Sequence, residues 1–296
     1  MLTQILMNSV LAALMLSLVA IGFNLIFNAT KVFHLAHGAI YVSAVYALYQ
    51  FNNVFTEILP PMISIPVSVI LSLLIISALI IIIEYLVYRP LYRKKVNPTI
   101  SMISSLGGYL LLVNLIVLFF GNESISLNSS YSIVVSNDYF KLTNIELRNL
   151  LISLILIAAV LLFSKTKFYI RIRAISDDYG VAEKFGVNIQ RTRFTALLVG
   201  TILVGVAGML KGSEVAIDPY VGLTLTLAAS VAVIVGGVKS LLGTIAACFV
   251  IALIENFSVK FLSAQWKDAL TYILLIAVLV FYQEGLVSTK QRIEAR

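Results

Sequence analysis

The segment from Met62 to Ile83 contains no charged residue, and it is the feature that most constrains the fold. The hydrocarbon core of a bilayer is about 30 Å thick, so a helix needs about 20 apolar residues to cross it. Within lipid every backbone polar group must be satisfied by the protein itself, which restricts spanning segments to helices and closed barrels. Similar apolar segments follow one another, and only 12% of the residues are charged. The sequence therefore predicts an all-α fold, a polytopic membrane helix bundle.

Nine apolar segments are candidate spans. Three of them, the second, seventh and eighth, are shorter than a full crossing, and glycines lie at or between them. Short, glycine-interrupted segments in two halves of a chain are typical of broken helices that line a pathway at the bilayer midplane. We therefore expect about eight to ten transmembrane segments. The nine segments are 5–29, 36–51, 62–88, 100–120, 147–164, 194–212, 222–237, 242–258 and 268–283, and the glycines are Gly38, Gly236, Gly237 and Gly243.

A weak internal echo favours two related halves. Residues 38–48 match residues 243–253 at glycine, isoleucine, valine, alanine and leucine positions. Self-similarity within a chain indicates a repeat, although apolar segments also match on composition alone. The echo predicts an internal two-fold repeat within a single transmembrane domain that spans residues 1–296.

The distribution of the net charge of +7 indicates membrane topology rather than nucleic-acid binding. Lysine and arginine gather in residues 89–95, in residues 165–193 and in the tail from about 284, whereas residues 121–146 are mainly acidic. Basic loops are retained on the cytoplasmic side of a membrane protein. The 165–193 loop is therefore expected inside and the 121–146 segment outside. The first apolar run lacks the flanks of a removable signal peptide and is expected to remain as a span.

A short amphipathic helix of about nine residues is predicted within the basic loop. Residues 176–178 supply a capping side chain and negative charge at its start, and Gly186 follows its last turn. Apolar residues recur at a spacing of three, which puts them on one face. Such a face could lie on the membrane or pack back on the bundle, or it could dock into a groove of a soluble partner. These apolar residues are Tyr179, Ala182 and Phe185.

Motifs for bond chemistry are missing from the sequence. The pattern G-x-x-x-x-G-K-[ST], which holds nucleotide phosphates, does not occur. His-Glu-x-x-His and Gly-x-Ser-x-Gly are absent as well. One cysteine and two histidines are too few for a cysteine or histidine-rich metal cluster. The sequence therefore predicts no catalytic residue, no metal site, no cofactor and no ATP hydrolysis by this chain.

Polar residues within or beside the spans have structural interpretations. Glu84, near the inner end of its span, is expected to pair with Arg89 or to extend to the interface. Asn24 and Asn28, one helical turn apart, are expected to bridge to a neighbouring helix. His34 is expected to be a hydrogen-bonded histidine at the interface.

Four ordered patches run over nearly the whole chain. They are Leu35-Ala36-His37-Gly38; Arg89-Pro90-Leu91; Gly107 with Asn114; and a longer set of Arg173-Ala174, Asp177, Ala182, Gly186, Asp218-Pro219, Gly222, Gly236-Gly237, Ser240 and Gly243. In residue type and order these patches resemble the membrane permease family of bacterial branched-chain amino-acid ABC importers.

The resemblance implies a permease subunit in the cytoplasmic membrane of a bacterium or archaeon. Such a subunit moves leucine, isoleucine or valine by alternating access. Its implied partners are ABC ATPase subunits, a paralogous second permease and an extracytoplasmic substrate-binding protein. Relatives in the same family move urea or short amides, and a self-contained secondary carrier is the alternative outside the family.

The resemblance also implies roles for individual residues. The loop helix becomes a coupling helix that docks on an ATPase, with Arg173, Asp177, Tyr179, Ala182, Phe185 and Gly186 as its coupling residues. The substrate pathway is expected at His37, Gly38, Asn114, Asp218, Gly236 and Gly237. The chain departs from the family pattern at His34, Val113, Ala228 and Lys239, where asparagine, glutamine, lysine and glycine are usual. Because of these departures, the identity of the substrate does not follow from the resemblance.

Overall fold

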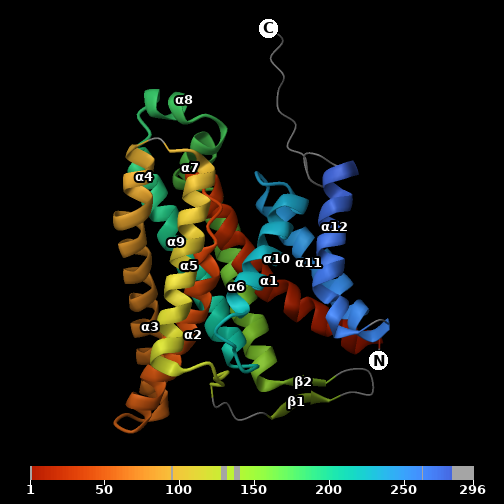
Figure 1. Cartoon of the computed structure of the whole chain (residues 1–296). Coiled ribbons are helices and arrows are strands. Elements are labelled where there is room, and N and C mark those ends of the chain that lie inside the picture. Colours follow the sequence, from red (N-terminus) through yellow and green to blue (C-terminus); the bar gives the residue numbers. More distant parts are fainter. Residues whose placement is uncertain (1, 95, 128–131, 137–140, 262, 282–296) are drawn as a thin grey trace.

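The computed structural model of the chain describes residues 2–94, 96–127, 132–136, 141–261 and 263–281 (Figure 1). This part of the chain is almost entirely helical, which confirms the predicted polytopic helix bundle. Its elements are α1 (Leu2–Thr30), α2 (Ala36–Thr56), α3 (Pro61–Ile83), the π-helical turn η1 (Glu84–Tyr88), α4 (Arg89–Arg93), α5 (Pro98–Phe120), β1 (Ile133–Ser136), β2 (Lys141–Thr143), α6 (Asn144–Phe163), α7 (Lys167–Asp177), α8 (Tyr179–Lys184), α9 (Ile189–Gly212), α10 (Val221–Gly236), α11 (Leu241–Phe261), the 3-10 turn η2 (Ala264–Trp266) and α12 (Lys267–Phe281).

Each of the nine predicted spans coincides with a helix. Within the described residues six helices are long and apolar enough to cross a membrane, namely α1, α3 with its continuation to Arg93, α5, α6, α9 and α11. The helix α10 and the apolar part of α12 are shorter. The helix α2 continues to Thr56 and is therefore longer than the predicted segment 36–51. The tail from 284 onward lies outside the described residues.

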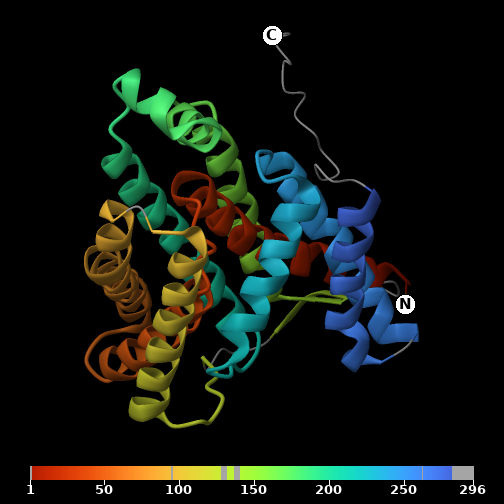
Figure 2. The ribbon, with the colours of Figure 1, turned by 45° about the horizontal axis from the view of Figure 1, so that its top comes forward.

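The two connecting regions of opposite charge lie at opposite ends of the bundle. The helices α7 and α8 form a cap at one end, which Figure 2 shows most clearly. The antiparallel hairpin of β1 and β2 lies at the other end, beside the start of α1 (Figure 1). This arrangement is the one required if the basic loop faces the cytoplasm and the acidic segment faces outside.

Local sequence signals account for where several helices begin. Pro98 occupies the first position of α5, and the Asn97 side chain accepts a hydrogen bond from the Thr99 amide at 3.0 Å. At the start of α6, Thr143 and Glu146 form a reciprocal capping box. These caps satisfy amides that the first helical turn leaves without partners.

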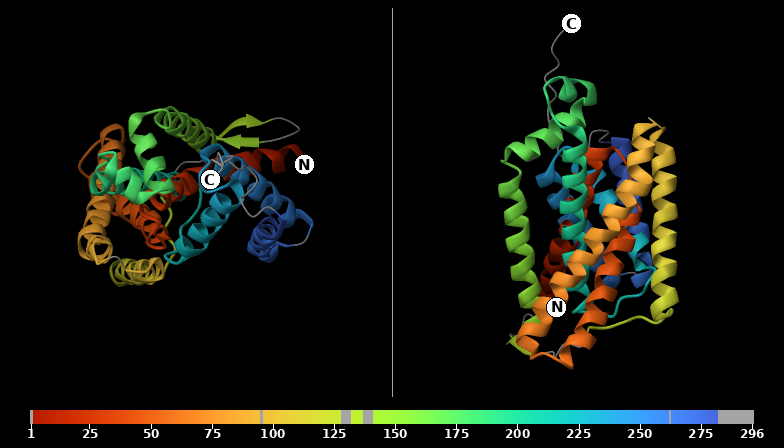
Figure 3. Two further views of the ribbon diagram at one scale, coloured as in Figure 1. Left: turned by 90° about the horizontal axis from the view of Figure 1, so that it is seen from above. Right: turned by 90° about the vertical axis from the view of Figure 1, so that its left-hand side faces the viewer.

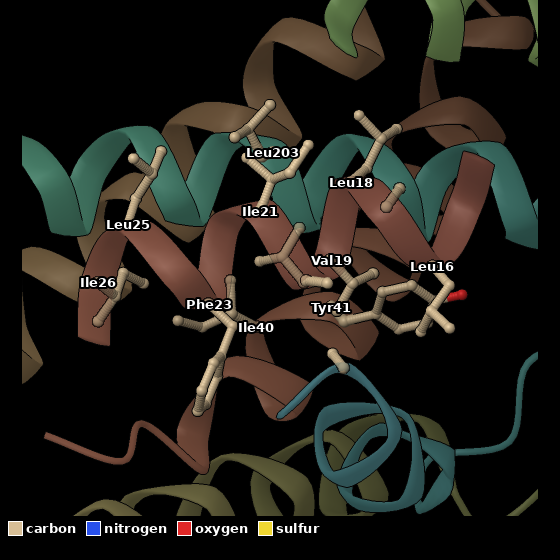
Figure 4. Close-up of a cluster of buried hydrophobic side chains, with 14 of the residues drawn as sticks. Leu16, Leu18, Val19, Ile21, Phe23, Leu25, Ile26, Ile40, Tyr41 and Leu203 are labelled. Carbon is tan, nitrogen blue, oxygen red and sulfur yellow. The ribbon is translucent and has the colours of Figure 1, made fainter. Parts of the chain in front are cut away.

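The helix α1 forms the centre of the bundle. Every residue from Ala13 to Ile26 is buried, and α1 packs against both α9 and α11. Figure 4 shows its apolar side chains beside Leu203 of α9 and Tyr41 of α2. The helices α3, α5 and α6 lie at the rim when the molecule is viewed from above (Figure 3) and expose leucines such as Leu118, which is 75% exposed. Their apolar outer faces suit contact with lipid.

Reciprocal glycine contacts hold the inner helices together. At each contact, a Cβ added to one glycine would overlap the backbone of the other glycine. Small residues allow this close approach of helices in membranes, where no hydrophobic effect drives helix association. The three pairs are Gly22 with Gly200 (α1 and α9), Gly38 with Gly222 (α2 and α10), and Gly236 with Gly243 (α10 and α11).

Candidate functional site

Two helices begin in the middle of the bundle rather than at its ends. The methyl group of Ala36, the first residue of α2, lies 3.8 Å from where Gly108 would carry a Cβ, and the Ala36 amide donates to Ser105 Oγ at 3.0 Å. Tyr109 Oη donates to the carbonyl of Tyr220, the residue before α10, at 3.1 Å. Gly108 and Tyr109 are central in α5, so α2 and α10 both start near the bilayer midplane. The prediction of broken helices therefore holds for α2 and α10, whereas α11 is long enough to cross a membrane, contrary to the prediction of a short segment at 242–258.

The starts of α2 and α10 meet at their glycines. Gly38 and Gly222 are both buried, and each backbone lies where the other residue would carry its Cβ. His37 is completely buried, with Nε2 3.2 Å from the Val19 carbonyl oxygen and its ring edge-on to Phe23. Of the predicted pathway residues, His37 and Gly38 therefore lie together, in a junction that is packed closed. We refer to Gly38, Gly222 and His37 as the midplane junction.

His34 is not at the interface, contrary to the prediction. It is completely buried, and its Nδ1 lies 2.5 Å from Tyr88 Oη of η1. The reason is that the chain after α1 turns back into the bundle before α2 begins, which carries His34 inward with Ala36. The histidine thus joins η1 to the segment that leads into the midplane junction.

The segment 213–220 leads into the midplane junction from the hairpin end of the bundle. Ile217 pairs with Ile125 in an isolated antiparallel bridge, and Tyr46 Oη donates to the Ile217 carbonyl at 3.2 Å. The predicted residue Asp218 is exposed, and its Oδ1 accepts the Tyr220 amide at 2.7 Å. Asp218 therefore lies close to the midplane junction along the chain, on an exposed segment.

Sequence reasoning missed the tyrosines that hold this region. Tyr46, Tyr109 and Tyr220 all donate hydrogen bonds through their hydroxyl groups to the outer segments. Buried tyrosine hydroxyls usually have a partner, so Tyr46 and Tyr109, which lie inside apolar spans, were an available signal. Their partners are distant in sequence, however, and only the fold identifies them.

Asn114 lies apart from the midplane junction. It is exposed on α5, and its side-chain amide donates to the Leu110 carbonyl of the same helix at 2.7 Å. One face of α5 near it is open, because no atom of the described residues lies within 4 Å of a Cβ added at Gly107. The structure therefore puts Asn114 on a face of α5 that the described residues do not cover.

The predicted break at Gly236 and Gly237 is a tight turn between α10 and α11. Gly237 has a φ of +92°, which favours glycine, whereas Gly236 is the contact partner of Gly243. The side-chain amides of Asn24 and Asn28 donate to the Val238 carbonyl at 2.9 and 2.8 Å. The predicted bridge to a neighbouring helix is confirmed for Asn24, which also donates to Thr244 of α11 at 3.2 Å, whereas Asn28 reaches the turn before α11.

The same turn is bonded to the end of α7. Ser176 Oγ donates to Asn28 Oδ1 at 2.6 Å, and Lys31 Nζ donates to Ser176 Oγ at 2.9 Å. Lys239 Nζ forms an ion pair with Asp177 Oδ1 at 2.5 Å. Burial, reinforced by the charge of Lys239, lowers the pKa of Lys31, and Asp177 opposes this shift. We call these contacts among α1, α7 and the α10–α11 turn the inner clip.

The predicted loop helix corresponds to α8, and a further helix, α7, precedes it in the basic loop. The helix α7 ends at Asp177, and Asp178 caps the six-residue α8 by accepting the Val181 amide at 2.9 Å. The cap and the position of the predicted helix are confirmed, but α8 has six residues rather than about nine. Gly186 ends α8 with a φ of +77°, as predicted. Arg173 is exposed on α7 and lines a small crevice with Asp177 and Lys239.

The predicted apolar stripe on this loop is divided between two faces. Ala182 is 3% exposed and packs with Ile175 and Ile189, whereas Phe185 is 84% exposed. Val181, which the prediction did not include, is 49% exposed. A six-residue helix tied to the bundle turns Ala182 inward, so the surface that remains for a partner is formed by Val181 and Phe185.

Aromatic stacking attaches α8 to the bundle. The ring of Tyr179 lies 5.6 Å from that of Tyr92 in α4, and the Arg193 guanidinium lies 4.0 Å above the Tyr92 ring. Burial raises the pKa of Tyr179, and the charge of Arg193 acts in the opposite direction. Displacement of α8 would therefore be transmitted to α4 and α9.

Replacing Ala182 with arginine is expected to destabilise the loop by at least about 3 kcal/mol, because overpacking and burial of a charge add together. Limited proteolysis of the purified chain should then cut the 165–193 loop at a protease dose that spares the wild type. Val181→Arg, one residue away and exposed, is the matched control and should resist as the wild type does. Equal resistance of both variants would contradict the inward placement of Ala182.

Comparison with known proteins assigns the chain to a family. The family model described as branched-chain amino acid transport system / permease component matches residues 5–279. The LivH permease of Salmonella typhimurium, named as a high-affinity branched-chain amino acid transport protein, is 26% identical over 96% of this chain and 94% of its own length. A probable LivH of Methanocaldococcus jannaschii is 26% identical (96% and 91%), and BraD of Pseudomonas aeruginosa is 24% identical (96% and 94%).

These relatives are transport permease components from bacteria and an archaeon. Together with six helices of spanning length in the described residues, they make the chain a multi-pass protein of the inner membrane. The chain belongs to the family of branched-chain amino acid transport system permease components.

Proposed function

We propose that this chain forms half of the transmembrane pathway of an ATP-driven importer for branched-chain amino acids. The observation that carries the proposal is the midplane junction, where the N-terminal ends of α2 and α10 meet. Helix N-termini carry partial positive charge. In transporters with discontinuous helices such ends face anionic groups of the substrate. A separation of Gly38 from Gly222 would expose two such ends to an amino-acid carboxylate.

The partners follow from what the chain lacks and from the surfaces it leaves open. It has no phosphate-binding loop, so ATP must be hydrolysed by separate subunits. Val181 and Phe185 form the apolar surface that an ATPase would cover. The open face of α5 around Gly107 and Asn114 would meet a paralogous second permease across the pathway. An extracytoplasmic binding protein would deliver substrate beside Asp218.

Two sets of contacts would transmit the motion of docked ATPases. The inner clip joins α7 to the turn that follows α10, through Ser176, Asn28 and the Val238 carbonyl. The stack of Tyr179, Tyr92 and Arg193 joins α8 to α4 and α9. Movement of the cap would therefore act on α10 directly, and α10 forms one side of the midplane junction. This is the rocking that alternating access requires.

The proposed substrates are leucine, isoleucine and valine, because the relatives that match over nearly their full length are named for branched-chain amino acids. The test is uptake of radiolabelled leucine by proteoliposomes that contain this chain, its second permease, both ATPases and the binding protein. Uptake should require ATP and should be inhibited by unlabelled isoleucine and valine. If urea or acetamide inhibits uptake instead, the substrate is a urea or a short amide and not a branched-chain amino acid. Uptake by the chain alone, driven by an ion gradient, would contradict the importer.

A further inference from the structure

A polar cavity lies away from the midplane junction, between η1, α4 and the start of α9. Its volume is about 170 Å³, which is room for several water molecules. Its charged lining residues are one acid and three bases, and Tyr85, 52% exposed, lies at its rim. These charged residues are Glu84, Arg89, Arg191 and Arg193.

Two of these charged side chains are buried with unused hydrogen-bonding atoms. Glu84 is 7% exposed and its Oε2 has no hydrogen-bond partner among the described residues. Arg193 is 3% exposed and its Nε likewise has no partner in the described part of the chain. Buried charges are expensive unless they are paired and hydrogen-bonded. Both atoms can therefore bond a group that the described residues do not supply.

The opposite charges in the cavity attract each other, but in the described part of the chain they do not meet in an ion pair. Within the described ranges Glu84 forms no ion pair within 4 Å, either with Arg89, as the sequence predicted, or with Arg193. The Arg89 guanidinium instead lies 5.0 Å above the ring of Tyr85, and the Arg193 guanidinium lies above Tyr92. Stacking on these aromatic rings holds both cations at the walls of the cavity. The Glu84 carboxylate and the guanidinium groups of Arg89 and Arg193 therefore line different parts of one cavity.

We propose that this cavity binds a zwitterion in which a primary ammonium group is linked to a phosphate or a carboxylate. The ammonium donates to Glu84, and the anionic oxygens accept from Arg193 and its neighbouring arginines, whose planar donor sets suit both anions. Two sources share this chemistry. One is the headgroup of phosphatidylethanolamine, and the other is a free amino acid in the cytoplasm.

The position of the cavity gives both sources access. Leu86, beside Tyr85 on η1, is 73% exposed, so a lipid tail could follow the outer face of this helix. Basic pockets among transmembrane helices on the cytoplasmic side are known to receive lipid headgroups. On the other side, Gln190 and Arg191 are exposed where α9 begins, next to the cytoplasmic cap. A bound zwitterion would also fix Arg193, on which Tyr92 and the attachment of α8 depend.

The test is titration of the purified, delipidated chain with phosphatidylethanolamine, phosphatidylcholine or leucine, followed by native mass spectrometry. Phosphatidylcholine is the matched probe, because its quaternary ammonium has the same charge and phosphate but no N–H to donate to Glu84. We expect phosphatidylethanolamine or leucine to bind at least about tenfold more tightly than phosphatidylcholine, since a hydrogen bond to a charged group contributes about this factor. Preference for the lipid identifies a headgroup site, and preference for leucine identifies a cytoplasmic amino-acid site.

Variants of the lining residues test whether the probe binds in this cavity rather than elsewhere on the chain. Glu84→Gln should weaken binding of the preferred probe about tenfold, whereas Glu57→Gln, an exposed glutamate in the loop after α2, should leave it unchanged. Glu84→Gln alone leaves the buried charge of Arg193 without an opposite charge at position 84. If that variant does not fold, the double variant Glu84→Gln with Arg193→Gln, which removes both buried charges, takes its place. Equal binding of all three probes, or unchanged binding in the Glu84 variants, would overturn the proposal and leave a cavity that holds water.

Discussion

Adding one methyl group at Gly38 is expected to destabilise the folded chain by about 3 kcal/mol or more, although alanine is the better helix former. The new Cβ would overlap the Gly222 carbonyl, and the reciprocal change at Gly222 would meet the backbone of Gly38. Overpacking of a core usually costs about 1–3 kcal/mol when side chains can adjust. Here the obstacle is backbone on both sides, so the helices themselves must separate. Heating the detergent-purified variant should therefore abolish its monodisperse chromatographic peak at a lower temperature than for the wild type.

Gly107→Ala is the matched control for this prediction. Gly107 also lies in a helix, but no atom of the described part of the chain lies within 4 Å of a Cβ added there. Alanine should be neutral or stabilising at this position by up to about 1 kcal/mol, because glycine disfavours helix interiors. The double variant of Gly38 and Gly222 should be less destabilised than the sum of the single variants, since one separation of the helices relieves both overlaps. A Gly38→Ala chain as stable as Gly107→Ala would contradict the closed midplane junction.

Replacing Phe185 with aspartate is expected to weaken association with the ATPase subunits strongly while the bundle stays folded. Phe185 is 84% exposed, so its removal costs the isolated chain little. An aromatic anchor at the centre of an interface commonly contributes about 2 kcal/mol or more, which corresponds to about a 30-fold loss of affinity. Pull-down of the ATPases by tagged variant membranes measures this loss, and ATP-dependent leucine uptake should be lost with it.

An exposed apolar residue at the opposite end of the bundle provides the control. Val134 in β1 is 53% exposed, and Val134→Asp should retain the ATPases as the wild type does. Phe185→Tyr, which keeps the ring, should retain most of the association. If Phe185→Asp still recovers the ATPases in wild-type amounts, the docking surface lies elsewhere and α8 only packs against the bundle.

Local interactions explain why so much of the helix pattern could be predicted. A span is recognisable because lipid requires a continuous run of apolar residues, and caps such as Asn97 and Asp178 act within a single turn. The bridging role of Asn24 and Asn28 could be predicted for the same reason, because a buried amide in a membrane helix needs a partner. The identity of that partner, the Val238 carbonyl, is not encoded near either asparagine.

The predictions that were wrong depended on the direction in which a side chain points. Ala182 and Phe185 share a stripe on an ideal helix, but α8 has only six residues and is held by Tyr92 and Arg193, so Ala182 faces inward. Glu84 was expected to pair with Arg89 or to extend to the interface, yet the Arg89 guanidinium lies above the Tyr85 ring and the carboxylate lines a cavity without an ion pair in the described ranges. In both cases contacts from other elements decided the outcome.

The sequence alone determined that the chain resides in a membrane, where its helices lie and which permease family it resembles. These properties depend on composition, on local spacing and on the order of short motifs, respectively. The tertiary structure alone decided that α2 and α10 begin at the same depth and that Gly38 meets Gly222. It also decided that a basic loop is bonded to a turn more than sixty residues later, through Asp177 and Lys239. Contacts between residues far apart in the chain depend on how tilted helices cross, and no local pattern specifies a crossing.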